Sequence, residues 1–378
     1  MREFPASPIT ALIDEKPLYN LGESMGRDLT VAGLLGPDGL AALSGVTIGY
    51  GTPAGDPALR ALVGARHDIP DSQVLITAGT ASGLFLAALL CGDGEIVVQR
   101  PCYPPMFDAP RGIGARVATV SSGFEDGYRT DLDAFASALS PRTRLAMIAS
   151  PQNPSGVMIT EGEVEQMLAA MARTCPQALL LIDETYREAT YGDAPPAASF
   201  AGTSPRLLTC ASLSKAYGVP GLRAGWLTVP DPGLYEQFRL AKFNSSVCCG
   251  TVDEFLATRL LSRADQVLAA RAAVLAQARG IVEHWIEAHT GRLAWLRPEA
   301  GAFCCVRLDP ATFGPEDVGR FHRHLAQQRT LVAPGPWFGD GEHIIRLGLG
   351  YEPAGQLELG LEVVSAALEA AAPQAAAR

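Results

Sequence analysis

The sequence is poor in charge and in aromatic residues, and basic side chains are its scarcer charged type. Charged residues make up 19% and aromatic residues 7% of the 378 positions, with 30 Lys and Arg against 40 Asp and Glu. The net charge of −10 argues against a surface that binds nucleic acid or an anionic membrane. We therefore expect neither nucleic acid nor a membrane as a partner. Lys and Arg side chains that bind an anion are expected to do so individually, within a site.

Long apolar runs and metal-binding cysteine patterns are missing. No run approaches the length that crosses a bilayer, and the first residues lack the apolar stretch of a secretory signal. The eight cysteines form no Cys-x-x-Cys motif, and no zinc-spaced histidines follow Cys248–Cys249 or Cys304–Cys305. The sequence therefore predicts a cytoplasmic protein without a metal site, in which most cysteines are small buried hydrophobic residues.

Short apolar runs alternate with helical segments from about residue 54 onward. The predicted strands are 73–77, 95–99, 144–149, 178–183, 207–212 and 224–229. Strand 178–183 is apolar on both faces, as central parallel strands are. A helix over 161–174 begins with Thr160 and Glu163, the pattern of a capping box. This alternation predicts an α/β fold with a mostly parallel sheet between layers of helices.

The chain is expected to divide into an arm and two domains. Residues 1–30 are interrupted by prolines and glycines, and we expect them to form an extended arm that packs on the smaller domain. Residues 31–255 would form the large domain and residues 256–378 a smaller α/β domain. A long helical stretch over 252–289 would lead from one to the other. The smaller domain would contain strands 302–308 and 343–347 and helices 315–328 and 355–371.

Polar residues fall at the carboxyl ends of the predicted strands, where open parallel sheets bind ligands. Asp183 ends an apolar strand; it is either a cap or ion-pair partner, or a buried carboxylate opposite a cation such as a pyridinium nitrogen. Lys215 follows the next strand, close to Ser212, Ser214 and Arg223. Serine and arginine bind phosphate well, whereas a lone strand-end lysine is more often a surface residue. A cation nearby would disfavour the ammonium form of the lysine, as an amine nucleophile requires.

Two turns of small residues carry weaker signals. The turn at 77–81 joins a strand to a helix, and its free N–H groups suit a phosphate, although an ordinary βα turn has the same composition. The turn at 151–156 would direct Asn153 toward an oxygen of a ligand ring.

Together these stretches resemble the class I and II aminotransferases, which are fold type I enzymes of the aspartate aminotransferase superfamily and use pyridoxal 5′-phosphate (PLP). Order and spacing match from about Tyr50 to Leu349. The matching motifs are Gly-Thr-Ala at 79–81, Pro-x-Tyr at 101–103, Asn-Pro-x-Gly at 153–156, Asp-x-x-Tyr at 183–186 and Ser-x-Ser-Lys-(x)7-Arg-x-Gly at 212–225. The resemblance implies a PLP-dependent transferase with a large and a small domain.

The resemblance also implies a role for each matching position. Lys215 would hold PLP as a Schiff base and shuttle protons, and Asp183 would pair with the pyridinium nitrogen. Tyr103 would stack on the ring, while Asn153 and Tyr186 would hydrogen-bond to its phenolic oxygen. The phosphate would be bound by Gly79, Thr80, Ala81, Ser212, Ser214 and Arg223.

Further matches concern the substrate and a second subunit. Tyr50 resembles a tyrosine that reaches the phosphate of the neighbouring subunit, which implies a homodimer with shared active sites. Arg346 resembles the arginine that clamps the substrate α-carboxylate, aided by Asn153; a surface arginine at a strand end is the alternative.

The N-terminal loop departs from the family pattern. Segment 20–26 lacks the proline found in the substrate loop of many relatives, so the substrate class stays open. Gly22 and Glu23 are expected at the substrate. Glu23 or Asp28 could meet a cationic side chain there, although solvated loop acids are common.

Several outcomes of the reaction remain open. The main prediction is an aminotransferase-like reaction of an α-amino acid through a Cα carbanion, in secondary metabolism. The stretches 213–226 and 331–339 are similar to capreomycidine-synthase-type enzymes, which cyclise a hydroxylated arginine on PLP. Elimination, replacement or cyclisation is therefore the alternative. A PLP-binding sensor without turnover is less expected, because only about fifty residues precede the Tyr50 motif and leave little room for a DNA-binding domain.

Overall fold

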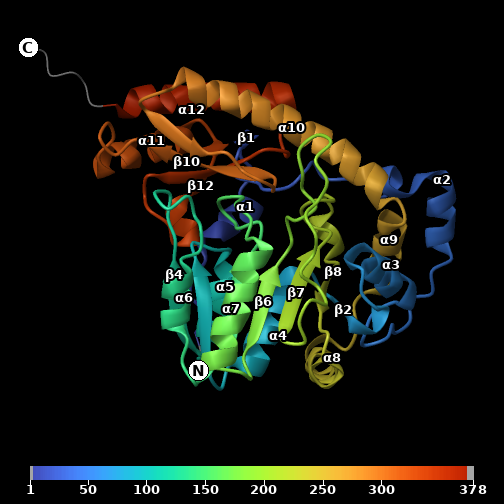
Figure 1. Ribbon diagram of the computed structural model, residues 1–378. Helices are drawn as coiled ribbons and strands as arrows, with labels where there is room; N and C mark the ends of the chain where they lie inside the picture. Colours follow the sequence, from blue (N-terminus) through green and yellow to red (C-terminus); the bar gives the residue numbers. More distant parts are fainter. Residues whose placement is uncertain (1–2, 373–378) are drawn as a thin grey trace, which may run out of the picture.

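The computed structural model describes residues 3–372, which form a large sheet between two layers of helices and a smaller sheet beside it (Figure 1). The large sheet has seven strands in the order β2-β8-β7-β6-β5-β3-β4. Strand β8 is antiparallel to both of its neighbours, β2 and β7, and the other neighbouring pairs of this sheet are parallel. The strands are β2 Val74–Thr77, β3 Glu95–Arg100, β4 Arg116–Ser121, β5 Thr143–Ala149, β6 Leu179–Asp183, β7 Leu207–Ser212 and β8 Gly225–Thr228. The predicted mostly parallel α/β fold is confirmed.

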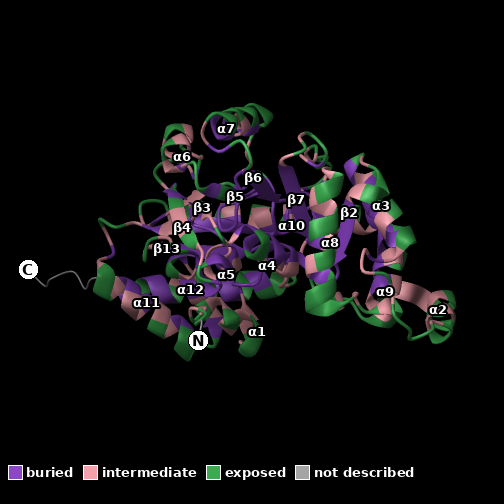
Figure 2. Ribbon diagram, turned by 90° about the horizontal axis from the view of Figure 1, so that it is seen from below, coloured by how far each residue is buried: buried purple, intermediate pink, exposed green. Residues whose placement is uncertain are grey.

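Helices cover both faces of this sheet because its central strands are apolar on both faces. In β6, Leu180 and Ile182 pack in one cluster with Met167, whereas Leu179 and Leu181 belong to the cluster on the opposite face. Figure 2 shows α6 and α7 on one side of the buried strands and α4, α5 and α8 on the other. These helices are α4 Thr80–Cys91, α5 Pro104–Gly112, α6 Leu132–Ala138, α7 Glu161–Thr174 and α8 Pro232–Ser246.

The smaller sheet is antiparallel and has the order β12-β13-β10-β9. Helix α10 is about 38 Å long at 1.5 Å per residue, and in Figure 1 it runs from the α9 side of the large sheet across to α12. The strands are β9 Leu293–Leu296, β10 Phe303–Leu308, β12 Ala333–Pro334 and β13 Ile344–Gly348. The remaining helices are α2 Val31–Ser44, α3 Pro57–His67, α9 Thr251–Leu261, α10 Ala264–Ala288, α11 Pro315–Gln327 and α12 Ala354–Ala371.

The N-terminal segment forms a separate two-stranded sheet with the chain that follows α11. Strand β1 (Tyr19–Asn20) pairs in parallel with β11 (Thr330–Leu331), which follows α11. The sequence predicted an extended segment, but the segment is not extended throughout. A 3-10 turn at Pro8–Thr10 leads into the short helix α1 (Ala11–Asp14).

Three further details differ from the sequence prediction. The helical stretch 252–289 is two helices, α9 and α10, with a break at Ser262 and Arg263. Strand β4 was not predicted; it lies at the edge of the sheet, where several residues are only partly buried, so its apolar pattern is weak. Strand β8 falls within the predicted range, but its antiparallel direction depends on the path of the connection 213–224, which contains a 3-10 turn and no crossover helix and which strand propensity does not encode.

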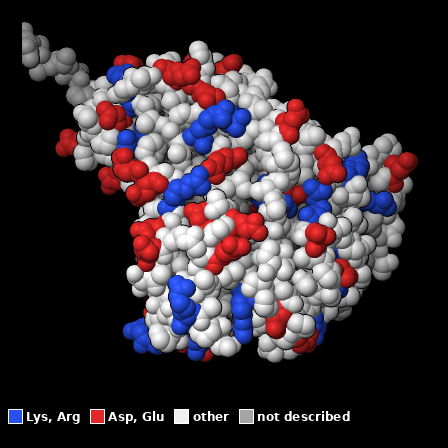
Figure 3. Space-filling view, viewed as in Figure 1, with Lys and Arg blue, Asp and Glu red and all other residues white. Residues whose placement is uncertain are grey.

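Charged side chains on the face of Figure 3 are mixed, with Lys and Arg dispersed among Asp and Glu. Within residues 3–372, no helix is both long enough and apolar enough to span a membrane. All eight cysteines are free, and only Cys248 and Cys249 are partly exposed.

Candidate active site

A cavity of about 590 Å³ lies between the carboxyl ends of the central strands and the N-terminal segment. Strands β5, β6 and β7 contribute their last residues to its wall, as expected for an open parallel sheet. The cavity brings together most of the residues singled out from the sequence. Those that line it are Glu23, Asp28, Thr80, Ala81, Tyr103, Asn153, Asp183, Tyr186, Ser212, Ser214, Lys215 and Arg223.

Lys215 forms an ion pair with Glu23 inside this cavity. Its Nζ lies 3.1 Å from Glu23 Oε1, although 192 residues separate the two in sequence. Burial lowers the pKa of Lys215, but Tyr186 and Glu23 more than offset this effect, so the pKa is raised. Burial likewise raises the pKa of Glu23, and Lys215, the Ser24 N–H and Arg346 together outweigh it, so that this pKa is lowered. Both groups are therefore charged in the protein alone. The sequence did not predict the contact between them.

Asp183 is a buried carboxylate at the end of β6. Its side chain accepts a 3.0 Å hydrogen bond from the Thr185 N–H, and the residue is 7% exposed. No Lys, Arg or His of the described chain lies within ion-pair distance of it. Burial raises its pKa to about 6. The site therefore favours a cation, or a shared proton, from a ligand at this position.

The amino end of α4 and Arg223 form a region suited to an anion. Gly79, with φ of 74°, precedes α4, and no side chain caps the helix, so its first N–H groups remain available. The Arg223 guanidinium donates to the Ala78 carbonyl at 3.3 Å. A Cβ on Gly79 would lie 2.5 Å from Arg223 Nη2, so the close approach of this guanidinium requires glycine.

Hydroxyl groups surround the same region. Thr80 Oγ1 lies 2.8 Å from Thr185 Oγ1, and the Ser214 N–H donates to Ser212 Oγ at 3.4 Å. Hydroxyl donors, free helix N–H groups and one guanidinium are the groups that bind phosphate in proteins.

Arg346 is buried, which rules out the surface arginine considered from the sequence. It lies on β13 with 1% of its surface exposed, and its Nη1 donates to Asn153 Oδ1 at 2.7 Å. Its Nη2 donates to the carbonyl of Gly22 at 2.7 Å. The guanidinium also lies over the Phe338 ring, 4.7 Å from its centroid. Arg346 thus sits behind the cavity wall and connects to it through Asn153.

Two tyrosines flank the cavity. Tyr103 follows β3 and precedes α5, and burial raises its pKa. The Tyr186 hydroxyl lies 2.7 Å from Ser24 Oγ, and its ring packs edge-on against Phe303, 4.6 Å between centroids.

Several contributors were missed in the sequence. Thr185 lies inside the Asp-x-x-Tyr motif, and Ser24 is next to Glu23, so both had a local signal. Other lining residues had none, because only the folding of distant segments places them there. These are Leu12, Ile13, Met25 and Tyr351.

Tyr50 is not brought into this cavity. It is 91% exposed and lines a separate depression with Glu254 and Arg259.

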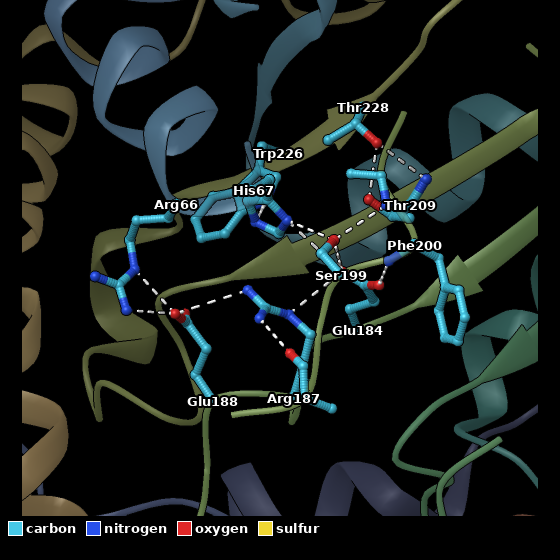
Figure 4. A network of polar contacts seen from close by, with 12 residues as sticks. Arg66, His67, Glu184, Arg187, Glu188, Ser199, Phe200, Thr209, Trp226 and Thr228 are labelled. Atoms are coloured by element: carbon cyan, nitrogen blue, oxygen red, sulfur yellow. Dashed lines mark hydrogen bonds and ion pairs between the residues drawn. The ribbon is translucent and has the colours of Figure 1, made fainter. Parts of the chain in front are cut away.

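A buried polar network supports the loops that follow β6 and β7 (Figure 4). Glu184 accepts from Ser199 Oγ at 2.6 Å and from the Phe200 N–H at 2.7 Å. Trp226 Nε1 donates to His67 Nε2 at 3.1 Å, which leaves His67 Nδ1 to donate to Ser199 at 2.7 Å. Burial lowers the pKa of His67 to about 3, so the ring is neutral.

The second half of the network joins three segments. Glu188 accepts two hydrogen bonds from Arg66 of α3, at 2.6 and 2.9 Å. Its other oxygen accepts from Tyr217, two residues after Lys215, at 2.8 Å. The chain after β6 and the chain after β7 are thereby tied together behind the cavity.

These groups fit PLP. Asp183 offers an unpaired buried carboxylate for a ring nitrogen, and Lys215 offers an amine for the aldehyde. The uncapped α4 terminus with Arg223 offers a place for the phosphate.

Comparison with known proteins agrees with this geometry. The family model for aminotransferase class I and II matches residues 20–354. Capreomycidine synthase of Streptomyces vinaceus is 31% identical over 351 residues, which cover 92% of this chain and 86% of the relative. Valine–pyruvate aminotransferase of Mycobacterium tuberculosis is 29% identical over 342 residues, or 85% of this chain and 84% of the relative.

Solved structures show the same fold. The crystal structure of a PLP-dependent aminotransferase from Streptococcus suis superposes with a TM-score of 0.85 at 23% identity and covers 95% of each chain. The prediction of fold type I is confirmed, and so is the requirement for PLP. The chain belongs to the class I and II aminotransferases, the PLP-dependent family that its sequence motifs resemble.

Proposed function

We propose that this aminotransferase-like enzyme binds PLP covalently through Lys215 and acts on an α-amino acid in the cavity described above. The observation that carries the proposal is the convergence of three complementary groups in one cavity. An amine, a buried carboxylate without a cation and an uncapped helix terminus correspond to the aldehyde, ring nitrogen and phosphate of PLP.

Asp183 would keep a proton on the ring nitrogen, because a charged carboxylate at this buried position is stabilised by a cation opposite it. When bound, PLP supplies an electron sink that stabilises negative charge on the substrate Cα. Asn153 and Tyr186 would hydrogen-bond to the phenolic oxygen, and Tyr103 would cover a ring face. Thr80, Ala81, Ser212, Ser214 and Arg223 would hold the phosphate, with Gly79 allowing their approach.

On the substrate side, Arg346 would bind the α-carboxylate in a bidentate manner. Its hydrogen bonds to Asn153 and Gly22 fix the plane of the guanidinium before the substrate arrives. The Nζ of Lys215, released from the cofactor by the incoming amine, would accept the Cα proton and return it at a different position.

The active site would be shared between two subunits. Tyr50 and Ile48 are 91% and 88% exposed, which supports a role for this segment in contacting a second copy. In a homodimer Tyr50 would complete the phosphate site of the partner. We also place the enzyme in the cytoplasm, supported by its eight free thiols.

Cyclisation with loss of a leaving group is the second candidate. It is supported by the 31% identity to capreomycidine synthase, whereas the valine–pyruvate aminotransferase supports transamination. The same similarity to capreomycidine synthase supports a role in natural-product biosynthesis. Incubation with amino acids separates the two outcomes. In transamination the cofactor converts to its amine form and a keto acid restores it. In cyclisation the amino acid is consumed without this conversion, and mass spectrometry identifies the product.

The anchoring role of Lys215 is tested by absorbance of the purified protein with added PLP. Lys215→Ala is expected to lose both the absorbance of covalently bound cofactor and turnover. The matched control is Lys16→Ala, because Lys16 is exposed and does not line the cavity. Retention of both properties in Lys215→Ala would show that another group anchors PLP.

A further inference from the structure

We propose that Glu23 selects amino acids whose side chain carries a positive charge, such as a guanidinium or an ammonium group. The inference rests on the proposed function, because it takes as given that Lys215 is bonded to PLP. It concerns the part of the cavity left over once cofactor and α-carboxylate are bound.

The charges in the cavity point to this preference. The charged side chains that line it are Glu23, Asp28, Asp183, Lys215 and Arg223. Lys215, Asp183 and Arg223 are assigned to the cofactor, and Arg346, behind the wall, is assigned to the α-carboxylate. The two lining residues that remain are both acidic. The space available to the substrate side chain is therefore negative.

Glu23 is the more important of the two acids. Its side chain is 12% exposed, and the cation it contacts is Lys215, at 3.1 Å. By contrast, Asp28 is exposed and lies near Arg271; burial lowers the pKa of Arg271, and the charge of Asp28 partly offsets this effect. Water and Arg271 can satisfy Asp28, whereas Glu23 depends on a cation inside the cavity.

In the PLP-bound enzyme, Lys215 no longer offers Glu23 a free ammonium group. While it is bonded to the cofactor, its nitrogen does not carry the three hydrogens of an ammonium group. Once the substrate amine releases it, the Lys215 amine must be neutral to accept the Cα proton. Glu23 Oε1 still accepts from the Ser24 N–H at 2.9 Å. Arg346 also stabilises the charge of Glu23, but no hydrogen bond joins the two, and the Arg346 nitrogens Nη1 and Nη2 donate to Asn153 and Gly22. A buried carboxylate that has lost its direct ion-pair partner is costly, so a substrate cation at this place is favoured over a neutral group of similar size.

The backbone around Glu23 holds the carboxylate in a fixed position. The N–H groups of Gly22 and Glu23 both donate to Asn20 Oδ1, at 3.3 and 3.2 Å. The Gly22 carbonyl accepts from Arg346, so the residue before Glu23 is tied to the proposed α-carboxylate site. A substrate clamped at one end by Arg346 thus meets a carboxylate whose position relative to Arg346 is set in advance.

The test compares amino acids of similar size and different charge. Dissociation constants and kcat/KM are measured for arginine against citrulline and for lysine against norleucine, with PLP bound. The dissociation constants come from titration of the cofactor absorbance and do not depend on turnover. The wild-type protein is expected to prefer the charged member of each pair by about 10-fold to 100-fold, the range for a hydrogen bond to a charged group.

Glu23→Gln is expected to bring the ratio between the charged and the neutral member of each pair, in affinity and in kcat/KM, down to about one. Glu15→Gln is the matched control, because Glu15 is an exposed acid on the same N-terminal segment. If Glu23 acts only on Lys215, the variant lowers kcat/KM for charged and neutral substrates by the same factor, and the proposal is wrong. If the wild-type protein binds both members of each pair with equal affinity, the proposal is wrong, and no variant is needed to show this. Loss of the cofactor absorbance in Lys215→Ala tests the proposed function separately.

Discussion

Replacing Asp183 by asparagine is expected to stabilise the protein in the absence of PLP, although it removes the group proposed to hold the ring nitrogen. Asp183 is 7% exposed and has no cationic partner in the described part of the chain. An asparagine oxygen can accept the same hydrogen bond from the Thr185 N–H. The substitution therefore removes a buried charge and keeps its shape and its acceptor.

The magnitude follows from the pKa of this carboxyl. Burial raises it from 3.8 to about 6 in the folded protein. At about 1.4 kcal/mol per pKa unit, ionisation of Asp183 costs the folded state up to about 3 kcal/mol. Because the folded state binds the proton more tightly than the unfolded state, wild-type stability falls as pH rises from about 4 to about 6 and stays lower above that. The asparagine of the Asp183→Asn variant does not titrate, so the advantage of the variant is absent near pH 4 and complete above pH 6.

Urea unfolding of the PLP-free proteins between pH 4.5 and 8 measures this difference, at a fixed protein concentration because a dimer is more stable when concentrated. Asp193→Asn, at an exposed acid, is the control. Added PLP is expected to stabilise the wild-type protein more than the variant, since only the wild type offers a carboxylate to the ring nitrogen. A gap that is independent of pH, or a PLP-free variant less stable than the wild type, would refute the reasoning.

Three other outcomes follow from the site. Arg346→Lys is expected to raise KM for the amino acid at least about 10-fold with cofactor absorbance intact, because a lysine cannot make two parallel bonds to a carboxylate; an unchanged KM would remove the assigned role. Tyr217→Phe leaves one oxygen of Glu188 without its donor and is expected to lower the free energy of unfolding by about 1–3 kcal/mol, and an unchanged urea midpoint would contradict this. Mixing unfolded Lys215→Ala and Tyr50→Ala chains and refolding them is expected to restore activity, since hybrid dimers contain one site with both residues intact; no gain over the separate variants would argue against shared sites.

Features set by short stretches of chain could be predicted from the sequence. The two apolar faces of β6 follow from its own residues, and the structure shows clusters on both sides of it. The capping box at the start of α7 is present, with Thr160 and Glu163 exchanging hydrogen bonds at 2.7 and 3.2 Å. Asp183 and Lys215 could be placed at strand ends because strand patterns fix where the strands stop.

Features that depend on distant segments could not be predicted. The pair of Glu23 and Lys215 and the anchoring of Arg346 by Gly22 join residues far apart in sequence. No local sequence pattern predicts which residue of the N-terminal segment will lie at the carboxyl ends of the strands. The break between α9 and α10 has no proline, so helical propensity alone gives no reason for it.

The sequence by itself determined the layered sheet through its periodicity, and it indicated the family and the cofactor through short motifs that resemble a known family. Tertiary structure decided which charges face the substrate. The N-terminal segment folds across the strand ends and buries Glu23 beside Lys215. Because water is largely excluded there, the charges that line the cavity interact strongly with one another and with a ligand. The strength of an ionic contact depends on distance and on exclusion of water, and both arise only when the chain has folded.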